Sequence, residues 1–171
     1  MKDFVHLHVH TQYSILDGQA SIPKLVDKAI KDGMRGIAVT DHGNMMGIKE
    51  FYNYIEKVKG KAKGSLKKAE EKLAQLNAGN YDISEDKSDG DYGKSVEQLV
   101  EETHKEIDKQ RKVLDFKPIF GCEMYVARRG DKKIKDQKID QSGWHLIVLA
   151  KNVKGYHNLI KLVSRSWVDG F

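Results

Sequence analysis

The sequence predicts an α/β fold built on parallel strands. Two short apolar runs, at residues 4–10 and 36–40, are each followed by an amphipathic segment with helical periodicity. Alternation of strands with helices is typical of parallel sheets whose faces are covered by helices. Residues 36–40 have the composition of a strand that is buried on both faces, and a further apolar run at residues 144–150 is the clearest buried strand in the sequence.

Each expected element has its own signals. A helix is expected to begin at Ser21-Ile22-Pro23, because proline in the first turn loses no hydrogen bond, and Gly33 offers a stop. The next helix contains Ile48 and the apolar positions that follow it at helical spacing. Residues 117–126 resume the strand pattern, and residues 156–163 form a last amphipathic helix.

Residues 57–115 interrupt this alternation. They contain no strand pattern, and their apolar residues are spaced for two helices, one after Ser65 and one capped by Ser95. The stretch between them, residues 77–94, is rich in Asp, Ser, Gly and Asn and is expected to be a mobile loop. We therefore predict a helical hairpin inserted at 57–115 with a mobile tip. Its lysines are expected to form a solvated face.

Bulk properties limit the classes of function. The 171 residues are enough for one domain or for part of a larger one. No apolar run approaches the roughly 20 residues that cross a bilayer, and no signal segment opens the chain. Cys122 is the only cysteine, so no internal disulfide can form and a cytoplasmic location is expected. A net charge of +5 permits an anionic partner such as nucleic acid without requiring one.

Candidate metal ligands lie on or beside the expected strands. His6, His8 and His10 alternate along the first run, so their side chains should share one face. Reactive groups collect where parallel strands end. The carboxylate or imidazole groups beside the strands are those of Asp17, His42, Glu123 and His145. His145 alone is at the start of its expected strand.

A mixture of imidazole and carboxylate ligands suits zinc, manganese or iron. Several such ions can polarise a phosphoryl oxygen and generate hydroxide at neutral pH. The sequence therefore predicts metal-assisted hydrolysis of a phosphate ester. Trp144 and Trp167 are expected to pack in the core rather than to stack on bases, and Cys122 is expected to be a small buried apolar residue.

Four short motifs together resemble the PHP (polymerase and histidinol phosphatase) domain. They are His6-Leu-His-Val-His-Thr11 with Asp17-Gly18, Thr40-Asp-His-Gly43, Gly121-Cys-Glu123 and Trp144-His-Leu146. The longer segments 4–18, 36–47 and 145–159 resemble the PHP domains at the N-terminus of bacterial DNA polymerase III alpha subunits. The resemblance covers residues 3–56 and 116–171 and leaves out the predicted hairpin.

The resemblance implies a distorted (β/α)7 barrel with up to three metal ions, zinc, manganese or iron, in its mouth. The residues that match ligand positions of the family are His8, His10, Asp17, His42, Glu123 and His145. His6 and Asp41 match motif positions with a supporting or occasional ligand role, and a carboxylate such as Asp41 commonly orients a neighbouring imidazole. The family's later Asp-x-His motif is missing, so we expect an incomplete, truncated PHP domain over residues 1–171.

By the same resemblance, the chain is expected to be the N-terminal PHP module of a replicative DNA polymerase. Its metal site would be a phosphoesterase or 3′–5′ proofreading exonuclease, and nucleotidyl transfer would lie elsewhere in the parent polymerase. Expected partners are DNA, the rest of the alpha subunit and other replisome subunits. Four basic residues either steer DNA toward the metals or form a solvated loop: Arg128, Arg129, Lys132 and Lys133. The alternatives are a free-standing phosphatase acting on a small phosphate ester and a non-catalytic scaffold.

Overall fold

A computed structural model gives the fold of the chain, and it describes residues 4–81, 93–130, 134, 138 and 143–169. The chain divides into two compact units, which are Met1–Ile55 with Lys117–Phe171, and Glu56–Phe116. The elements are α1 (Ile22–Lys31), β1 (Gly36–Val39), α2 (Ile48–Asn77), α3 (Val96–Asp115), β2 (Lys117–Val126), β3 (Trp144–Leu149) and α4 (Val153–Asp169). The mixed α/β class agrees with the sequence prediction.

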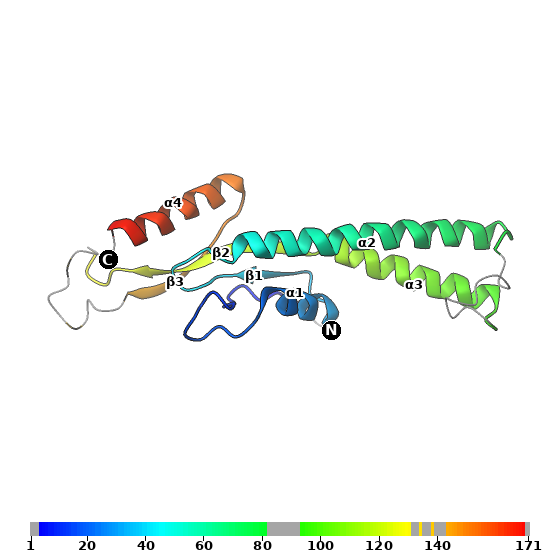
Figure 1. The fold of residues 1–171 in the computed structure, drawn as a ribbon, viewed down its shortest axis with the longest axis horizontal. Helices are drawn as coiled ribbons and strands as arrows, with labels where there is room; N and C mark the ends of the chain where they lie inside the picture. The colour runs from blue at the N-terminus through cyan, green and yellow to red at the C-terminus, as the bar shows by residue number, and fades with distance from the viewer. Residues whose placement is uncertain (1–3, 82–92, 131–133, 135–137, 139–142, 170–171) are drawn as a thin grey trace. The chain divides into compact units, whose positions relative to one another are not determined.

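The sheet of the first unit has the order β1-β2-β3 (Figure 1). Strands β1 and β2 are parallel, with Gly36 opposite Lys117, as expected for an α/β fold. Strand β3 is antiparallel to β2, with His145 opposite Tyr125, so the expectation of parallel strands is wrong for β3. Consequently the beginning of β3 lies beside the end of β2.

The N-terminal segment runs beside β1, but residues 4–10 do not form the strand that their alternation predicts. Ala38 donates its N–H to the carbonyl of His6, and Thr40 donates to that of Val9, both at 2.9 Å. The acceptors are three residues apart while the donors are two apart. Regular strand pairing requires equal spacing on both sides, so the segment bends at Leu7, whose side chain is exposed.

Helix α1 and the loop after it follow their sequence signals. Pro23 lies in the first turn, and Gly33 ends the helix with a φ of 76°, which few other residues adopt without strain. The buried face of α1 consists of Ile22, Val26 and Ala29.

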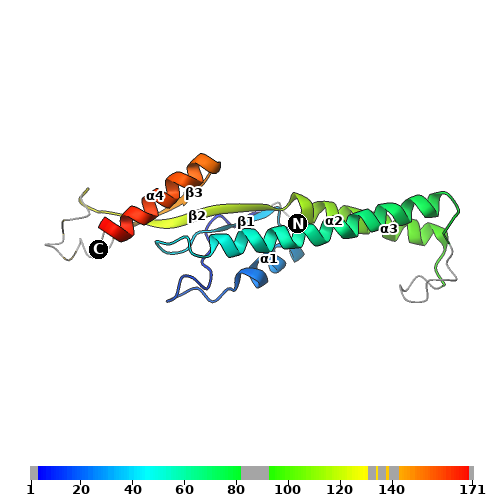
Figure 2. The same cartoon turned by 45° about the horizontal axis from the view of Figure 1, so that its top comes forward.

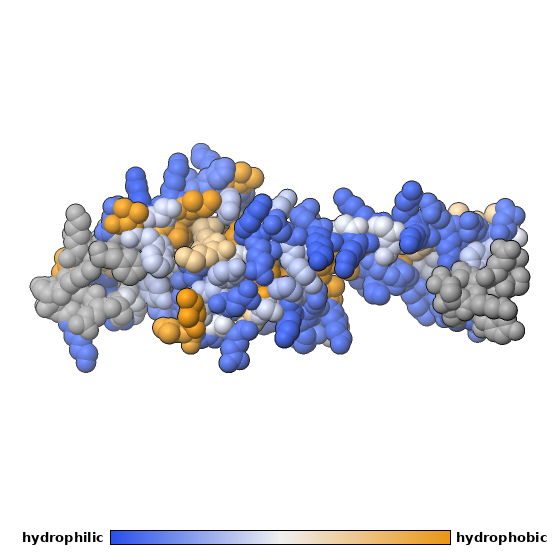
Figure 3. Space-filling view, in the orientation of Figure 1, coloured by the Kyte–Doolittle hydropathy of each residue, from blue (hydrophilic) through white to orange (hydrophobic). Residues whose placement is uncertain are grey.

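Helix α4 covers one face of β2 (Figures 1 and 2). Its buried residues Leu159 and Val163 pack against Cys122 of β2. Other apolar residues of α4, including Leu162, remain exposed, and Figure 3 shows apolar side chains at the surface over this helix.

Strand β3 is less buried than its composition suggests. Trp144 is 60% exposed, and Trp167 at the end of α4 is 51% exposed, so the prediction that both tryptophans are core residues is wrong. In the described sheet β3 pairs with β2 alone, and an edge strand leaves alternate side chains in solvent.

The two expected helices near residues 48 and 66 are replaced by the single helix α2, which begins in the first unit and continues through the second. Its buried positions Ile55, Ala62, Ala69 and Leu76 are seven residues apart. This spacing keeps one apolar seam along the helix, which outweighs the propensity cost of the glycines within it. The sequence prediction treated a change of composition as a break between helices.

Helix α3 begins where it was expected. Ser95 accepts a hydrogen bond from the N–H of Gln98, whose side chain accepts one from the N–H of Ser95. Arg111 of α3 pairs with Glu70 of α2 at 3.2 Å. Residues 82–92, most of the expected mobile tip, lie outside the described residues. That residues 57–115 are an insertion therefore stays a prediction.

Candidate metal centre

The carboxylate of Glu123 on β2 is surrounded by histidines, although the residue is only 1% exposed. Its Oε2 atom lies 2.9 Å from His8 Nε2 and 2.8 Å from His10 Nε2. Its Oε1 atom lies 2.6 Å from His145 Nδ1 and 3.1 Å from His42 Nδ1. One buried carboxylate thus brings together four imidazoles from three separate stretches of the chain.

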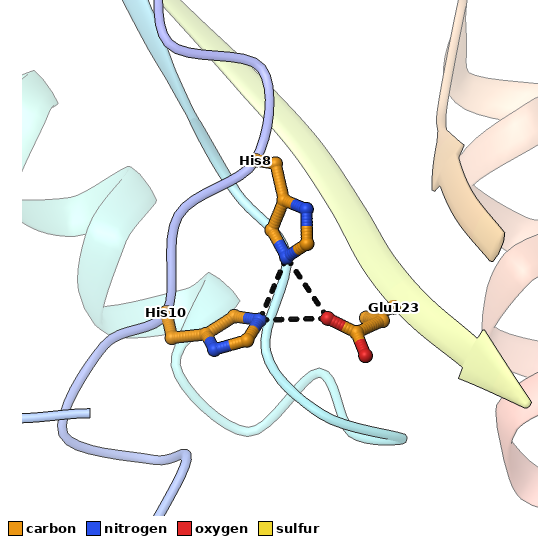
Figure 4. Close-up of side chains that lie close together, drawn as sticks. All are labelled: His8, His10 and Glu123. Carbon is orange, nitrogen blue, oxygen red and sulfur yellow. Dashed lines mark hydrogen bonds and ion pairs between the residues drawn. The ribbon is translucent and has the colours of Figure 1, made fainter. Parts of the chain in front are cut away.

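Three of these groups converge on one point. Figure 4 shows the ring nitrogens of His8 and His10 and an oxygen of Glu123 at the corners of a small triangle. The two Nε2 atoms lie 2.9 Å apart, so a single proton at most fits between them. Among the described residues, Oε1 of Glu123 is a buried atom with no partner in hydrogen-bond geometry. Lone pairs that face a common point in this way are suited to a divalent cation.

Asp17 extends the cluster to a second group. Its Oδ2 atom lies 2.8 Å from His42 Nε2 and 3.4 Å from His10 Nδ1. The ligand atoms of His10, Asp17 and His42 all lie within 4.8 Å of one another, as do those of His8, His10 and Glu123. His10 belongs to both groups through opposite ring nitrogens, and because a neutral imidazole has one lone pair, it can serve as a ligand in one group at a time.

Backbone pairing between the loop after β1 and strand β2 places His42 beside Glu123. The two residues form a parallel bridge, in which Glu123 N–H donates to the carbonyl of Asp41 and Gly43 N–H donates to the carbonyl of Glu123. Gly43 has a φ of 58°, and the loop leaves the sheet there. Sheet pairing therefore continues beyond β1 to the two ligand candidates.

Asp41 fixes the loop that carries Asp17. Its buried carboxylate accepts hydrogen bonds from Thr11 N–H at 2.6 Å, Thr11 Oγ1–H at 2.9 Å and Ser14 Oγ–H at 2.8 Å. A Cβ atom on Gly18 would lie 1.8 Å from the carbonyl oxygen of Thr11, so the loop closes only with glycine there. The contacts of Asp41 thus serve the loop rather than the ring of His42.

The antiparallel direction of β3 explains the position of His145. The sequence placed this residue at the start of a parallel strand, far from the strand ends where ligands gather. Since β3 runs opposite to β2, its first residues lie beside the last residues of β2 and His145 reaches Glu123.

Printed contacts describe two of the remaining predicted residues, His6 and Arg128. The ring of His6 meets that of Phe4 edge-on at 4.7 Å, and His6 is in neither group of ligand atoms that the described residues form. The guanidinium of Arg128 lies 4.4 Å from the centre of the Trp144 ring. Arg129 is among the described residues, whereas Lys132 and Lys133 lie outside them.

Tyr125, which was not among the residues predicted from the sequence, contacts two histidines of the cluster. Its hydroxyl lies 2.8 Å from His42 Nδ1, and its ring centre lies 4.8 Å from that of His145. The available signal was its position two residues after Glu123, on the same face of the strand. Trp167 was likewise missed as a contact of the site, and its Nε1–H donates to the carbonyl of Gly43 at 2.8 Å.

Charge within the cluster changes several pKa values. Burial by itself would lower the pKa of His42, but the hydrogen bond to Asp17 and the charges of Glu123 and Asp17 raise it above its usual value. The hydrogen bond from His42 lowers the pKa of Asp17. Burial opposes ionisation of Glu123, yet the hydrogen bond with His10 and the nearby histidines leave its pKa lowered. Both carboxylates are therefore ionised at neutral pH, as metal binding requires.

Cys122 lies next to Glu123 but is not a ligand candidate. Its side chain is fully buried, and burial, followed by the charges of Asp41 and Glu123, raises the pKa of the thiol to about 12. A thiol with this pKa holds its proton at neutral pH and acts as a small apolar residue.

Comparison with known proteins identifies the family of the chain. The chain matches the sequence profile of the family described as "PHP domain" over residues 6–171. The chain belongs to the PHP domain family. The resemblance seen in the sequence motifs is confirmed, and the profile match includes all eight candidate ligand and supporting residues.

Curated proteins that are similar to this chain include DNA polymerase subunits. It is 32% identical over 168 residues to the DNA polymerase III subunit alpha of Borreliella burgdorferi and 31% identical over 175 residues to that of Aquifex aeolicus. It is 33% identical over 170 residues to the same subunit of Chlamydia muridarum. These alignments cover 98–99% of the chain but only 9–10% of each relative. The chain thus spans about a tenth of the length of the relatives it matches.

Proposed function

We propose that this PHP domain is the N-terminal module of a replicative DNA polymerase and that its metal centre hydrolyses phosphodiesters at the 3′ end of DNA. The observation that carries the proposal is the carboxylate of Glu123, whose Oε2 atom lies beside His8 and His10 and whose Oε1 atom lies beside His145, so that its two oxygens could each hold an ion. Two cations held side by side can clamp the attacking and leaving oxygens of a phosphoryl displacement. A proofreading exonuclease needs this chemistry.

The proposed ligands are His8, His10, Asp17, His42, Glu123 and His145. Zinc, manganese and iron suit this set of nitrogen and oxygen atoms, and up to three ions would bind in a complete domain. The metal would supply a Lewis acid and a bound hydroxide. The protein would orient the ligands through the buried carboxylates of Glu123 and Asp41.

A DNA substrate is supported by a basic and aromatic surface close to the centre. Trp144 is exposed, precedes His145 and stacks with Arg128. Exposed aromatic rings with arginine are typical of single-strand binding surfaces, because every base offers a ring face. We propose that Arg128 and Arg129 contact DNA, together with Lys132 and Lys133.

The proposal extends to the complete fold and to the partners of the domain. The strands and helices would belong to a distorted (β/α)7 barrel, and residues 57–115 would be a helical insertion in it. The rest of an alpha subunit and other replisome subunits would be its partners, in the cytoplasm. Within the described residues, the helices lack the combination of length and apolar character that a membrane crossing requires.

Elemental mass spectrometry of the purified chain tests the metal centre. We expect stoichiometric zinc, manganese or iron in the wild type and loss of metal in the double variant His8→Ala/His10→Ala. His157→Ala is the matched control, because His157 is exposed on α4 and should be dispensable for metal binding. Equal metal content in the wild type and the double variant would refute the proposed ligands.

The proposed exonuclease activity is tested by a second assay. A full-length polymerase that contains this domain should release nucleotides from the 3′ end of labelled single-stranded DNA, and His8→Ala/His10→Ala should abolish the release. Metal loss without any loss of nucleotide release would indicate the scaffold role instead. Hydrolysis of small phosphate esters but not of DNA would support the free-standing phosphatase reading.

A further inference from the structure

Tyr125 contacts the cluster through both its hydroxyl and its ring. The hydroxyl lies 2.8 Å from Nδ1 of His42, and the two rings are nearly parallel, with an interplanar angle of 18°. The edge of the same ring meets His145 at 89°. The opposite ring nitrogen of His42, Nε2, lies 2.8 Å from Asp17. The ring of His42 is thus held between a carboxylate and a phenol.

The proton of a neutral His42 must move between its two nitrogens when a metal binds. Without metal, the ionised Asp17 can only accept, so Nε2 carries the proton and Nδ1 carries a lone pair. With a metal on Nε2, the proton must be on Nδ1. Any partner of Nδ1 therefore has to donate in one form and accept in the other.

A hydroxyl can do both, whereas a carboxylate cannot. Oε1 of Glu123 lies 3.1 Å from the same Nδ1 atom, but it is only an acceptor and would face a lone pair in the metal-free form. Tyr125 donates its O–H to Nδ1 in that form and accepts the Nδ1 proton in the other. Its ring is fixed on one side by His145 and lies 3.6 Å from the place where a Cβ atom of Gly43 would be.

We infer that Tyr125 is a positioning residue of the metal centre, whose hydroxyl keeps Nε2 of His42 directed toward Asp17 both with and without metal. The inference rests on the proposed metal site for the metal-bound form, whereas its metal-free part stands on the observed contacts alone. It adds a residue that is not itself a ligand and that acts on the second ligand group, His10-Asp17-His42.

The test compares Tyr125→Phe with Tyr54→Phe in the 171-residue chain. Tyr125→Phe keeps the ring and removes the hydroxyl. Tyr54→Phe is the matched control, because its hydroxyl contacts Asp27 rather than the cluster. Zinc affinity is measured by competition with a chromophoric chelator. The tautomer of His42 is read from long-range ¹H–¹⁵N correlation spectra with and without zinc, at a pH where its ring is neutral.

In the wild type we expect the Nε2–H tautomer without zinc and the Nδ1–H tautomer with zinc. Tyr125→Phe should weaken zinc binding about tenfold, as loss of a ligand's outer partner does, and should mix the two tautomers in the metal-free form. Tyr54→Phe should match the wild type. Unchanged affinity together with an unchanged tautomer in Tyr125→Phe would overturn the inference.

A wild type that binds no zinc, manganese or iron would refute the proposed function but not this inference. The metal-free spectra would then decide it. A tautomer shift in Tyr125→Phe alone would support the positioning role, and identical spectra for both tyrosine variants would reject it.

Discussion

Asp41→Asn isolates the role of one buried carboxylate, because the amide has the same shape without the charge. Asp41 lies in the loop after β1 and accepts three hydrogen bonds from Thr11 and Ser14, all of them buried. These bonds fasten the loop that presents Asp17 to His42. The substitution should therefore weaken both the fold of the first unit and the metal centre.

Asp41→Asn is expected to lower the free energy of unfolding by about 2–3 kcal/mol. A hydrogen bond to a charged group contributes about 1.5–3 kcal/mol and a neutral one about 0.5–1.5, so each of the three bonds loses about 1 kcal/mol. In addition, the amide nitrogen would face Oγ1 of Thr11 at 2.9 Å, and that hydroxyl must turn to accept. Part of this destabilisation is offset, because the variant no longer has to bury a charge.

Urea unfolding followed by tryptophan fluorescence measures this change. Both tryptophans, Trp144 and Trp167, belong to the unit that contains the cluster, so the signal reports on that unit. Asp27→Asn is the control, since Asp27 makes an exposed contact with Tyr54. The control should change the free energy of unfolding by less than about 0.5 kcal/mol.

Two results would refute the reasoning. If Asp41→Asn unfolds within about 0.5 kcal/mol of the wild type, the three hydrogen bonds do not stabilise the loop. If it is destabilised but binds zinc as tightly as the wild type, Asp41 supports the fold without positioning Asp17. Loss of both properties in Asp27→Asn as well would show that the assay reports general damage.

Two further predictions concern titration and the thiol. The raised pKa of His42 stabilises the metal-free fold below the unfolded value of 6.5 and loses this effect as the pH rises through the folded value. The lowered pKa values of Asp17 and Glu123 stabilise it above their unfolded values of 3.8 and 4.5, so the urea midpoint should be highest between pH 4.5 and 6.5 and should fall on both sides. If the urea midpoint did not fall as the pH rises above 6.5, the result would contradict the proposed effect of His42. Cys122 should react with a thiol reagent only after unfolding, because it is fully buried and its pKa is about 12; rapid labelling of the native chain would show that α4 does not cover it.

Local signals in the sequence were sufficient to predict helices α1 and α3. Pro23, Gly33 and the capping box at Ser95 each act within a few residues, so α1 and α3 begin and end close to where they were expected. The length of α2 was misjudged, because the seam of Ile55, Ala62, Ala69 and Leu76 overrides a local rise in glycine and lysine.

The residue types of the candidate metal centre were also evident from the sequence. Histidines and carboxylates in short motifs identified His8, His10, Asp17, His42, Glu123 and His145, and the contacts bring all six together. Their roles as ligands remain predictions. Alternation alone suggested a regular first strand, but pairing with β1 at unequal spacing bends it at Leu7.

The sequence by itself determined the family, the mixed α/β class and the chemistry of the candidate ligands, because composition and motif spacing are properties of neighbouring residues. Only the tertiary structure decided the direction of β3, which moves His145 to Glu123, and the contact of Tyr125 with His42. It also gave Asp41 its partners on the loop. These contacts join segments far apart in the chain, and strand direction and loop closure depend on packing that no local pattern records.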